Sequence, residues 1–309
     1  MAERLTVAVP TFRRNDDLRE LVPLLVDHAT ALRERDGMEV RVLLVDNDPE
    51  GGARPVVESL GRDDVVYVHE PEPGLAAVRQ RALDESTSWD LLAFLDDDGR
   101  PAPQWLAALV DTWRHTGAAA VAGKVVEHYL TPPSSWIVAG GFFRRRSLPT
   151  GTVVPSAPTT NLFLDLRQVR DLGMAFDRRF GLSGGEDTFF TSQLTARGGR
   201  IVWCEESQVV DQVPTDRMSP SWVLRRAWSH GNTTAIVNQA LAATARARHA
   251  VRVRDVAGGV LRCLAGLARF VLGVVTRSQE RRAKGLRTAA RGLGMASGSF
   301  GAVFEEYSR

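Results

Sequence analysis

Three consecutive carboxylates, Asp96, Asp97 and Asp98, follow the apolar run LLAFL at residues 91–95. Like charges a few ångströms apart repel one another, so an uncompensated triplet would weaken the fold, and a positive group is expected beside it. Asp96 and Asp98 offer hard oxygen ligands suited to Mg²⁺ or Mn²⁺, which take further ligands from water and from a substrate diphosphate. The alternative is a solvated turn, because Asp and Gly are common turn residues.

Other polar residues follow or flank predicted strands in the same way. Asp46 ends the run VLLV, where it could accept hydrogen bonds from a base or ribose. Pro10, Thr11 and Phe12 end the first run with a backbone edge and a ring against which a base could rest. Arg79 lies on a predicted helix, within reach of a phosphate. Taken singly, Asp46 could instead cap a turn, and Arg79 could be a solvated helix residue.

The elements that must position these residues alternate along the first ~125 residues. Short β-branched runs are predicted as strands at 5–9, 40–45, 65–68, 91–95 and 118–123, and helical stretches near 15–34, 53–60, 75–86 and 103–116. Such alternation is typical of parallel strands in an α/β sheet. Ligands of open sheets bind beyond the carboxyl ends of the strands, so PTFRR, DND and DDD are expected to meet at one crevice.

The second half of this domain is predicted from NLFLDL, a helix opening near GGEDTFF, and the strand IVWCEE. From about residue 219 only helices are expected. We therefore predict one catalytic domain over residues 1–218 and a helical region over 219–309. The composition is that of an ordinary globular chain, with a formal net charge of +2. Its two cysteines lack metal-ligand spacing, so we expect a cytosolic chain with neither a disulfide framework nor a zinc site. The first ten residues lack the apolar stretch of a signal peptide.

Positive charge gathers at the C-terminal end. Residues 246–309 hold 13 Arg/Lys against 4 Asp/Glu, which leaves the remainder acidic. The apolar segment 256–275 is interrupted by Arg262 and Arg269, which makes a membrane span unfavourable. The pattern favours an amphipathic helix lying on an anionic membrane surface, with packing against the protein's own body as the alternative.

Seven segments together resemble the inverting nucleotide-sugar glycosyltransferases of family 2, with the GT-A fold. These are VAVPTFRRNDDLRELV, VLLVDNDP, EPGLAAVRQRALDES, AFLDDDGRPAPQWL, TTNLFLD, FGLSGGEDTFF and VPTDRMS, in family order over roughly residues 5–240. The likeness is greatest to bacterial exopolysaccharide glucosyltransferases of the succinoglycan type. It implies a Rossmann-like, mostly parallel sheet flanked by helices, followed here by a C-terminal helical extension.

The resemblance also implies roles. Pro10, Thr11, Phe12, Asp46 and Arg79 would bind the nucleotide sugar, Asp96 and Asp97 would contact nucleotide and ribose, Asp98 would be the chief metal ligand with Asp96, and Asp187 would be the catalytic base. Glu186 would orient Asp187 or bind the acceptor. The competing interpretation of this pair is a helix N-terminus, where carboxylates stabilise the macrodipole by about 0.3–1 kcal/mol. Gln80 departs from the family pattern, in which Asn is commoner.

The resulting hypothesis is a cytoplasmic, peripheral-membrane, Mg²⁺- or Mn²⁺-dependent transferase. It would move a hexose from a nucleotide-diphosphate sugar, expected to be UDP-linked, to a hydroxyl of a saccharide or lipid-linked acceptor, without binding nucleic acid. The alternatives are a haloacid-dehalogenase phosphatase, a response-regulator receiver, a sugar nucleotidyltransferase and a non-catalytic nucleotide-sugar binder. The phosphatase signature has Thr at the position where this chain has Arg100. The segment TFRRND after the first strand lacks the glycines of a nucleotidyltransferase loop.

Overall fold

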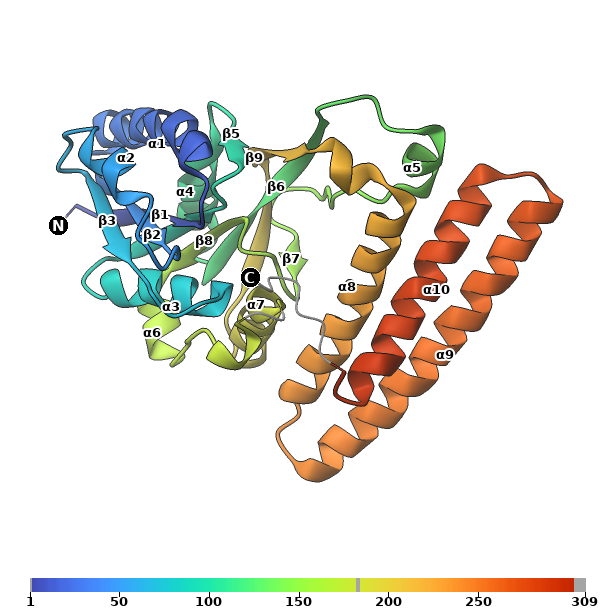
Figure 1. Ribbon diagram of the computed structural model, residues 1–309. Coiled ribbons are helices and arrows are strands. Elements are labelled where there is room, and N and C mark those ends of the chain that lie inside the picture. Colours follow the sequence, from blue (N-terminus) through green and yellow to red (C-terminus); the bar gives the residue numbers. More distant parts are fainter. Residues whose placement is uncertain (1, 182–183, 303–309) are drawn as a thin grey trace. The chain divides into compact units, whose positions relative to one another are not determined.

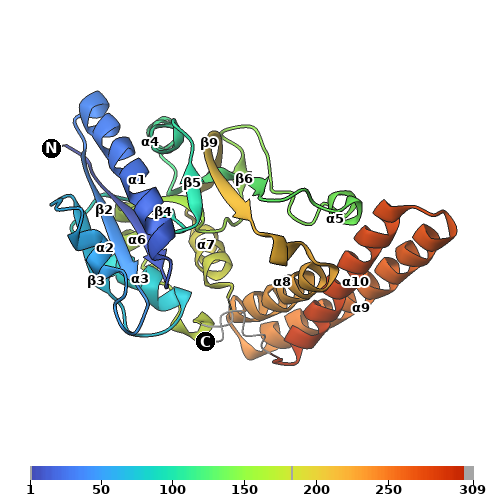
Figure 2. The same ribbon diagram turned by 45° about the horizontal axis from the view of Figure 1, so that its top comes forward.

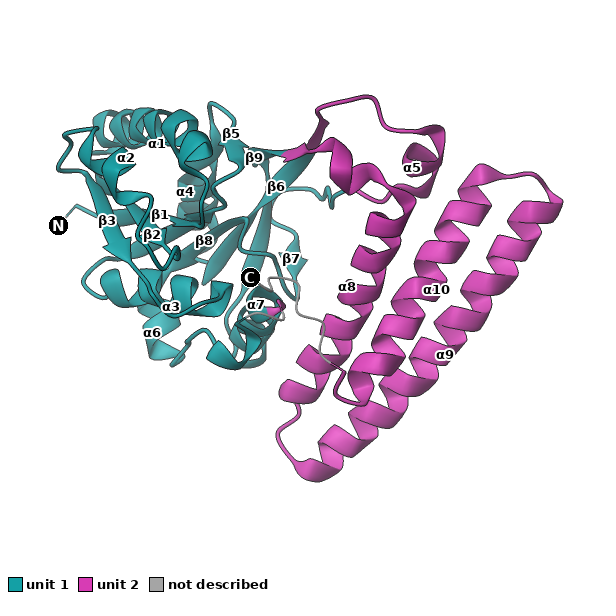
Figure 3. Cartoon of the chain, viewed as in Figure 1, with its two compact units in different colours: residues 1–126, 145–181, 186–211 teal, residues 127–144, 182–185, 212–309 magenta. Residues whose placement is uncertain are grey.

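Residues 2–181 and 184–302 are described by a computed structural model of the chain (Figure 1). The chain forms two compact units, coloured separately in Figure 3. The first comprises residues 1–126, 145–181 and 186–211, and the second comprises residues 127–144, 182–185 and 212–309. The domain boundary placed after residue 218 from the sequence stays a prediction.

The first unit is built on a sheet. In the described part of the chain this sheet has nine strands in the order β3-β2-β1-β4-β8-β6-β9-β5, with β7 beside β9. The strands are β1 (Arg4–Thr11), β2 (Glu39–Asp46), β3 (Val65–His69), β4 (Leu91–Leu95), β5 (Gly99–Pro101), β6 (Ala120–Tyr129), β7 (Val153–Val154), β8 (Asn161–Asp165) and β9 (Ile201–Val213).

The four strands β3, β2, β1 and β4 pair in parallel, as the sequence predicts. Their order reverses at β1, because the chain builds outward to β2 and β3 and then returns to place β4 on the other side. Open α/β sheets bind their ligands at such a reversal, beyond the carboxyl ends of the strands. Thr11 and the triplet that begins at Asp96 lie at these ends.

The fifth predicted strand, β6, does not pair with β4. Strand β8 lies between them and runs antiparallel to both, so β6 keeps the direction of β4 without touching it. The residue pattern identifies β8 as a strand but does not specify its partners. All five of its residues are buried.

Helices cover both faces of the sheet (Figures 1 and 2). Strand residues alternate between two cores, as in Leu43 and Leu44 of β2. The helices α1 (Asn15–Asp36), α2 (Arg54–Glu58) and α4 (Trp105–Thr116) pack on one face, and α3 (Leu75–Glu85), α6 (Leu166–Asp171) and α7 (Glu186–Ala196) on the other. Burial on both faces explains why these strands read as continuous apolar runs. A short helical turn, η1, spans Arg178–Phe180.

The second unit is helical. It contains α5 (Ser135–Gly140), η2 (Thr215–Met218), α8 (Pro220–Ala240), α9 (Ala245–Val275) and α10 (Gln279–Ser299). Helix α10 lies between α8 and α9 (Figure 3). Near the start of α8, an aromatic cluster joins Phe143 to Trp222 by ring stacking at 5.9 Å. The C-terminal helical extension predicted from the sequence is therefore present.

Glu205 of β9 fixes the loop that precedes β7. Glu205 accepts hydrogen bonds from Ser147 Oγ at 2.6 Å and Trp203 Nε1 at 2.8 Å, and forms an ion pair with Lys124. Partial burial works to raise the pKa of Glu205. The hydrogen bonds from Lys124, Ser147 and Trp203 outweigh it and lower the pKa to about 2. The carboxylate is thus stabilised in its charged form.

We expect Glu205→Gln to lower the free energy of unfolding at pH 7 by about 1–2 kcal/mol, a modest value because the side chain is partly solvated. The folded-state pKa is depressed, so the wild-type advantage is complete above the ordinary Glu pKa of 4.5 and is lost as pH falls toward about 2. Urea titrations of both proteins at pH 7, 5 and 3.5 measure this. A difference in unfolding free energy between the two proteins that stays constant with pH would contradict the prediction. Glu50→Gln, at an exposed position, is the control.

Candidate active site

The acidic triplet lies beside the end of β1. Thr11 Oγ1 donates a hydrogen bond of 2.9 Å to Asp97 Oδ2, which joins the carboxyl ends of β1 and β4. Asp97 is buried, whereas the side chains of Asp96 and Asp98 keep 33 % and 26 % of their surface exposed. The middle carboxylate therefore faces the protein while its two neighbours remain open to solvent.

Arg14 supplies part of the positive charge expected beside the triplet. Its guanidinium lies 3.7 Å from Asp97 and 3.3 Å from Asp98. Burial outweighs the attraction of Arg14 and, together with the charge of Asp98, raises the pKa of Asp97 to about 7. The sequence predicts a compensating charge but did not identify Arg14, although the basic pair in TFRRND directly after β1 was a usable signal.

Arg79 of α3 connects the triplet to the second acidic pair. Its Nη2 lies 3.6 Å from Asp96 Oδ1, and its Nη1 forms an ion pair with Glu186 Oε1. The side chains of Arg79 and Glu186 are only 5 % and 2 % exposed. Two carboxylate groups that are 90 residues apart in the sequence are thus joined through one buried guanidinium.

The pair formed by Arg79 and Glu186 is not fully satisfied. In the described part of the chain, Arg79 Nε and Glu186 Oε2 are enclosed without a hydrogen-bond partner. Burying polar atoms in this way costs free energy, and native proteins retain few such atoms. The arrangement is therefore costly for stability.

Asp187 follows Glu186 in the first turn of α7 and is partly exposed. Its Oδ1 accepts hydrogen bonds from the backbone N and the hydroxyl of Thr188. Behind it, Phe190 stacks on Phe176 at 4.2 Å and Phe189 on Phe180 at 4.8 Å, so the helix end that carries Asp187 is fixed by aromatic packing.

The two glycines before this helix both have positive φ, 71° at Gly184 and 93° at Gly185, a conformation that favours glycine. This explains the GG of the segment FGLSGGEDTFF, of which Leu182 and Ser183 lie outside the described residues. Gln80, the departure from the family pattern, accepts a hydrogen bond from Phe176 N at 2.8 Å. Gln80 thus helps to hold α3, and with it Arg79, against the segment that precedes α7.

On the nucleoside side, Asp46 is fully buried, and both its oxygens have protein donors. Oδ1 accepts from Asp48 N, and Oδ2 accepts from Ala53 N and the Tyr67 hydroxyl, all at 2.9–3.0 Å. Asp46 therefore shapes the turn after β2 in this structure, and its contact with a nucleoside stays a prediction. Pro10 and Thr11 are buried at the end of β1, and Phe12 is partly exposed just beyond it.

Two residues beside this edge were missed by the sequence interpretation. Arg13 has a left-handed backbone, with φ 55°, and donates to Asp48 at 3.0 Å. Such a conformation is uncommon outside glycine and clusters at functional sites. Asn47 donates to the backbone oxygens of Glu70 and Glu72 and accepts from Gly74 N, which ties the ends of β2 and β3 to the start of α3.

The donor set of the triplet fits a hard divalent cation. Asp96 and Asp98 present partly exposed carboxylates, and Mg²⁺ is commonly held by one or two carboxylates together with substrate phosphates and water. No closed group of three His, Cys, Asp or Glu ligands occurs among the described residues.

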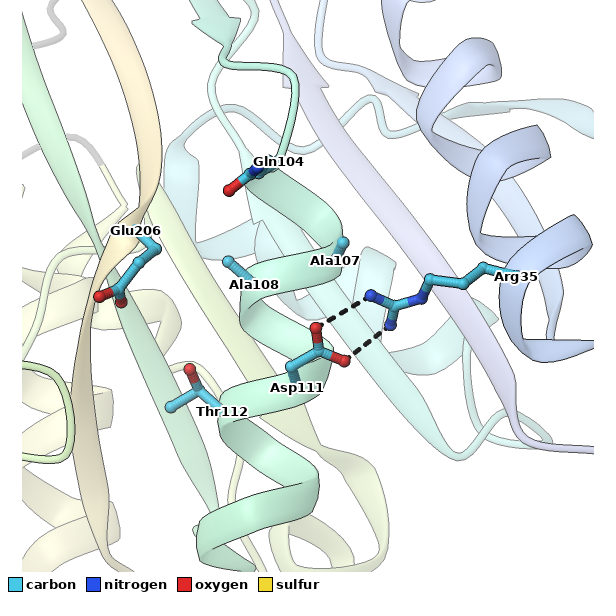
Figure 4. A pocket seen from close by; sticks show the side chains of 7 residues that line it. All are labelled: Arg35, Gln104, Ala107, Ala108, Asp111, Thr112 and Glu206. Carbon is cyan, nitrogen blue, oxygen red and sulfur yellow. Dashed lines mark hydrogen bonds and ion pairs between the residues drawn. The ribbon is translucent and has the colours of Figure 1, made fainter.

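A hollow of about 450 Å³ lies between α4 and β9, near the last turn of α1 (Figure 4). Arg35 and Asp111 at its rim bind each other through two hydrogen bonds of 2.7 and 2.9 Å. The last turn of α1 leads back toward the amino ends of the strands, away from the triplet. The mutual neutralisation of this pair leaves the hollow without a free charged group from either residue.

Comparison with known proteins agrees with this geometry. Residues 6–165 match the family described as Glycosyl transferase family 2, and residues 91–279 match Glycosyl transferase family group 2. The succinoglycan biosynthesis protein ExoM of Rhizobium meliloti (strain 1021) is 35 % identical over 232 residues, which cover 74 % of this chain and 73 % of ExoM. The chain belongs to glycosyltransferase family 2. Glycosyltransferase AglE of Haloferax volcanii is 25 % identical to this transferase over 65 % of its chain and 64 % of AglE.

Solved structures show the same fold at low identity. TarS 1-349 of S. aureus has a TM-score of 0.52 and 13 % identity over 91 % of this transferase and 89 % of that chain. The structure of GalNAc-T7 with UDP, GalNAc and Mn²⁺ has a TM-score of 0.55 and 14 % identity over 79 % and 52 % of the two chains. This family 2 glycosyltransferase therefore has the GT-A fold predicted from its sequence.

Proposed function

We propose that this glycosyltransferase is an inverting, divalent-metal-dependent enzyme that transfers a hexose from a UDP-sugar to a hydroxyl of a saccharide or lipid-linked acceptor. The observation that carries the proposal is the double contact of Arg79, which brings the triplet and the Glu186–Asp187 pair to one place. The relative ExoM is described as a succinoglycan biosynthesis protein. TarS has been solved with UDP-GlcNAc.

In this proposal Asp187 is the general base. An alcohol is a weak nucleophile at neutral pH, so a carboxylate must take its proton as the oxygen attacks the anomeric carbon. The new carbon–oxygen bond forms on one face of the sugar while the bond to the diphosphate breaks on the other, and the diphosphate leaves with the electron pair. Attack and departure on opposite faces invert the configuration of the anomeric carbon.

Asp98 and Asp96 would hold the metal ion. When bound, Mg²⁺ or Mn²⁺ neutralises the negative charge that grows on the leaving diphosphate. Asp97, Thr11, Pro10 and Phe12 would contact the nucleotide, and Arg79 lies close enough to Asp96 to stabilise the same region. Arg14, which pairs with Asp97 and Asp98, would add positive charge to the same region.

Glu186 is assigned a positioning role. It is enclosed beside Arg79, so it is more suited to fixing the start of α7 than to contacting an acceptor. We expect Arg79→Leu to cost about 3–5 kcal/mol of unfolding free energy, because Glu186 is then left as a buried, unpaired charge. The double variant Arg79→Leu, Glu186→Leu should recover most of that stability while remaining inactive. Urea unfolding and UDP-release assays measure the two effects.

The two outcomes separate packing from function. A double variant no more stable than Arg79→Leu alone would show that the ion pair does not cause the loss. A stable double variant with wild-type transfer would remove Arg79 and Glu186 from the site. Arg19→Leu is the control for an exposed arginine whose partner, Asp16, is also solvated.

The donor is identified by a thermal-shift panel of UDP-, GDP- and dTDP-sugars with and without Mn²⁺. A ligand that binds only the native state raises the melting temperature by mass action. We expect the largest rise with one UDP-sugar and Mn²⁺ together. NMR of the transferred anomeric proton then tests the stereochemistry, and retention of configuration would refute the inverting mechanism.

We further propose that the enzyme works at the cytoplasmic face of the membrane, beside its acceptor. Helix α9 is long and apolar enough to cross a membrane by length and composition, and 17 % of its apolar stretch is buried. Residues 212–302 contain fifteen Arg/Lys and three Asp/Glu, a balance that favours an anionic surface.

A further inference from the structure

Helices α9 and α10 form an antiparallel hairpin closed by glycines. Gly259, Gly266 and Gly273 repeat every seven residues on α9. Gly259 and Gly266 face Gly292 and Gly285 on α10, and Gly273 faces the backbone at Arg281 and Arg282. A Cβ added to Gly266 would lie 2.4 Å from the backbone of Ala289, and one added to Gly292 would lie 2.5 Å from Gly259 O. The two backbones therefore touch, and no larger residue fits between them without separating the helices.

The opposite face of α9 is uncovered within the described chain. Large apolar side chains between 46 % and 75 % exposed form a broad stripe along it: Val253, Val260, Leu261, Leu264, Leu267, Val271, Leu272, Val274 and Val275. Contiguous apolar surfaces of this extent are rare on soluble monomers and mark contact sites. The hairpin thus has one face fixed to its own protein and one available to a partner.

The composition of α10 decides against a transmembrane α9. Because the glycine contact runs from Gly259 to Gly273, a spanning α9 would draw α10 into the hydrocarbon with it. Helix α10 carries five cations, Arg281, Arg282, Lys284, Arg287 and Arg291. Even on lenient insertion scales each costs about 2.5–3.5 kcal/mol near the centre of a membrane helix.

Charge identifies the partner of the uncovered face. Cations gather where the hairpin turns, at Arg277, Arg281 and Arg282, close to the apolar end of α9. A second protein copy would bring the same positive charge and be repelled, whereas anionic lipid would be attracted. An apolar stripe on a basic helix is the form of segment that lies in the headgroup region.

We propose that the α9–α10 hairpin is a monotopic membrane anchor, in which α9 lies in the plane of an anionic bilayer with its outer stripe among the acyl chains and its glycine face on α10. At 1.5 Å per residue, the 31 residues of α9 would extend about 46 Å along the surface. This inference deepens the membrane association proposed above, and it does not depend on the identity of donor or acceptor.

The first test is binding of the full-length protein to vesicles of phosphatidylcholine with or without phosphatidylglycerol. We expect binding that requires the anionic lipid and falls by about tenfold or more in Leu264→Glu, Val271→Glu, because two apolar anchors become charged. Val153→Ser, at an equally exposed apolar position of β7, is the matched control. Donor-induced thermal shifts should be unchanged in all variants, so loss of vesicle binding is distinguished from loss of the proposed catalytic function.

The second test separates an in-plane helix from a spanning one. Ala243→Cys and Gln279→Cys flank α9 and are introduced singly into a Cys263→Ser background, in which the remaining Cys204 is buried. In inverted membrane vesicles an impermeant maleimide should label both positions. Labelling of only one position would overturn the proposal in favour of a span. The proposal would also be overturned if the full-length protein did not bind vesicles and light scattering showed that it dimerises through α9.

Discussion

Asp187→Asn is expected to lower kcat about 10²–10⁴-fold, the range typical of a missing general base. The amide keeps the size of the side chain but cannot accept the acceptor's proton. Donor affinity should remain within about twofold, because Asp187 is assigned to the acceptor side and not to the diphosphate. UDP release with the preferred donor measures kcat, and calorimetric titration of donor with Mn²⁺ measures affinity.

The control for this variant is Asp171→Asn, an exposed carboxylate at the end of α6. It should leave both quantities at wild-type values. Transfer by Asp187→Asn at a near-normal rate would show that another group takes the proton. If the variant lost donor binding as well as transfer, Asp187 would instead belong to the donor side.

The second large effect is expected at the metal site. Asp98→Asn removes one charged oxygen from the proposed ligand set, so the Mn²⁺-dependent part of donor binding should fall about 10²-fold or more. EDTA should have the same effect on the wild-type protein and almost none on the variant. Thermal shifts with donor alone, Mn²⁺ alone and both together measure the coupling.

Exposed Asp63→Asn in the turn before β3 serves as the control for lost negative charge. A variant Asp98→Asn that keeps a full Mn²⁺-dependent shift would exclude Asp98 as the chief ligand. Asp98 also pairs with Arg14, so the unfolding free energy of the variant is compared with the wild type before binding is interpreted.

The sequence predicts the first half of the fold well because local pattern decides it. Apolar residues at helical spacing, such as Leu18, Leu21, Val22 and Leu25, bury one face of α1, and the apolar runs of β1 to β4 are covered on both faces. The position of β8 between β4 and β6 was not predictable in this way. Pairing partners depend on the whole tertiary arrangement rather than on the residues of one strand.

The candidate site shows the same division. The triplet's need for a counter-charge follows from Coulomb repulsion alone, but the groups that supply it, Arg14 and Arg79, come from different segments. Asp46 illustrates the reverse case. It ends a strand, but its carboxylate accepts hydrogen bonds from Asp48 N and Ala53 N in the turn that follows. Glu186 was expected to orient Asp187 or to meet the acceptor, and only its burial with Arg79 favours positioning.

The C-terminal helices held a readable signal that the sequence interpretation passed over. Arg262 and Arg269 lie seven residues apart on α9, and glycines recur on the same helix at the same interval. A seven-residue repeat of glycine marks a face on which another backbone can approach closely. Both alternatives drawn from the sequence, packing on the protein and binding a membrane, are compatible with one helix that has two different faces.

A guanidinium shared between two carboxylate groups has a bearing on redesign. Altering the cation or nucleotide preference by changing Asp96 would release one arm of Arg79 and, through Glu186, disturb the start of the helix that carries Asp187. Variants selected for a new donor will therefore tend to lose rate with every acceptor. Libraries that leave this three-residue bridge untouched and diversify the surrounding loops should keep more working members.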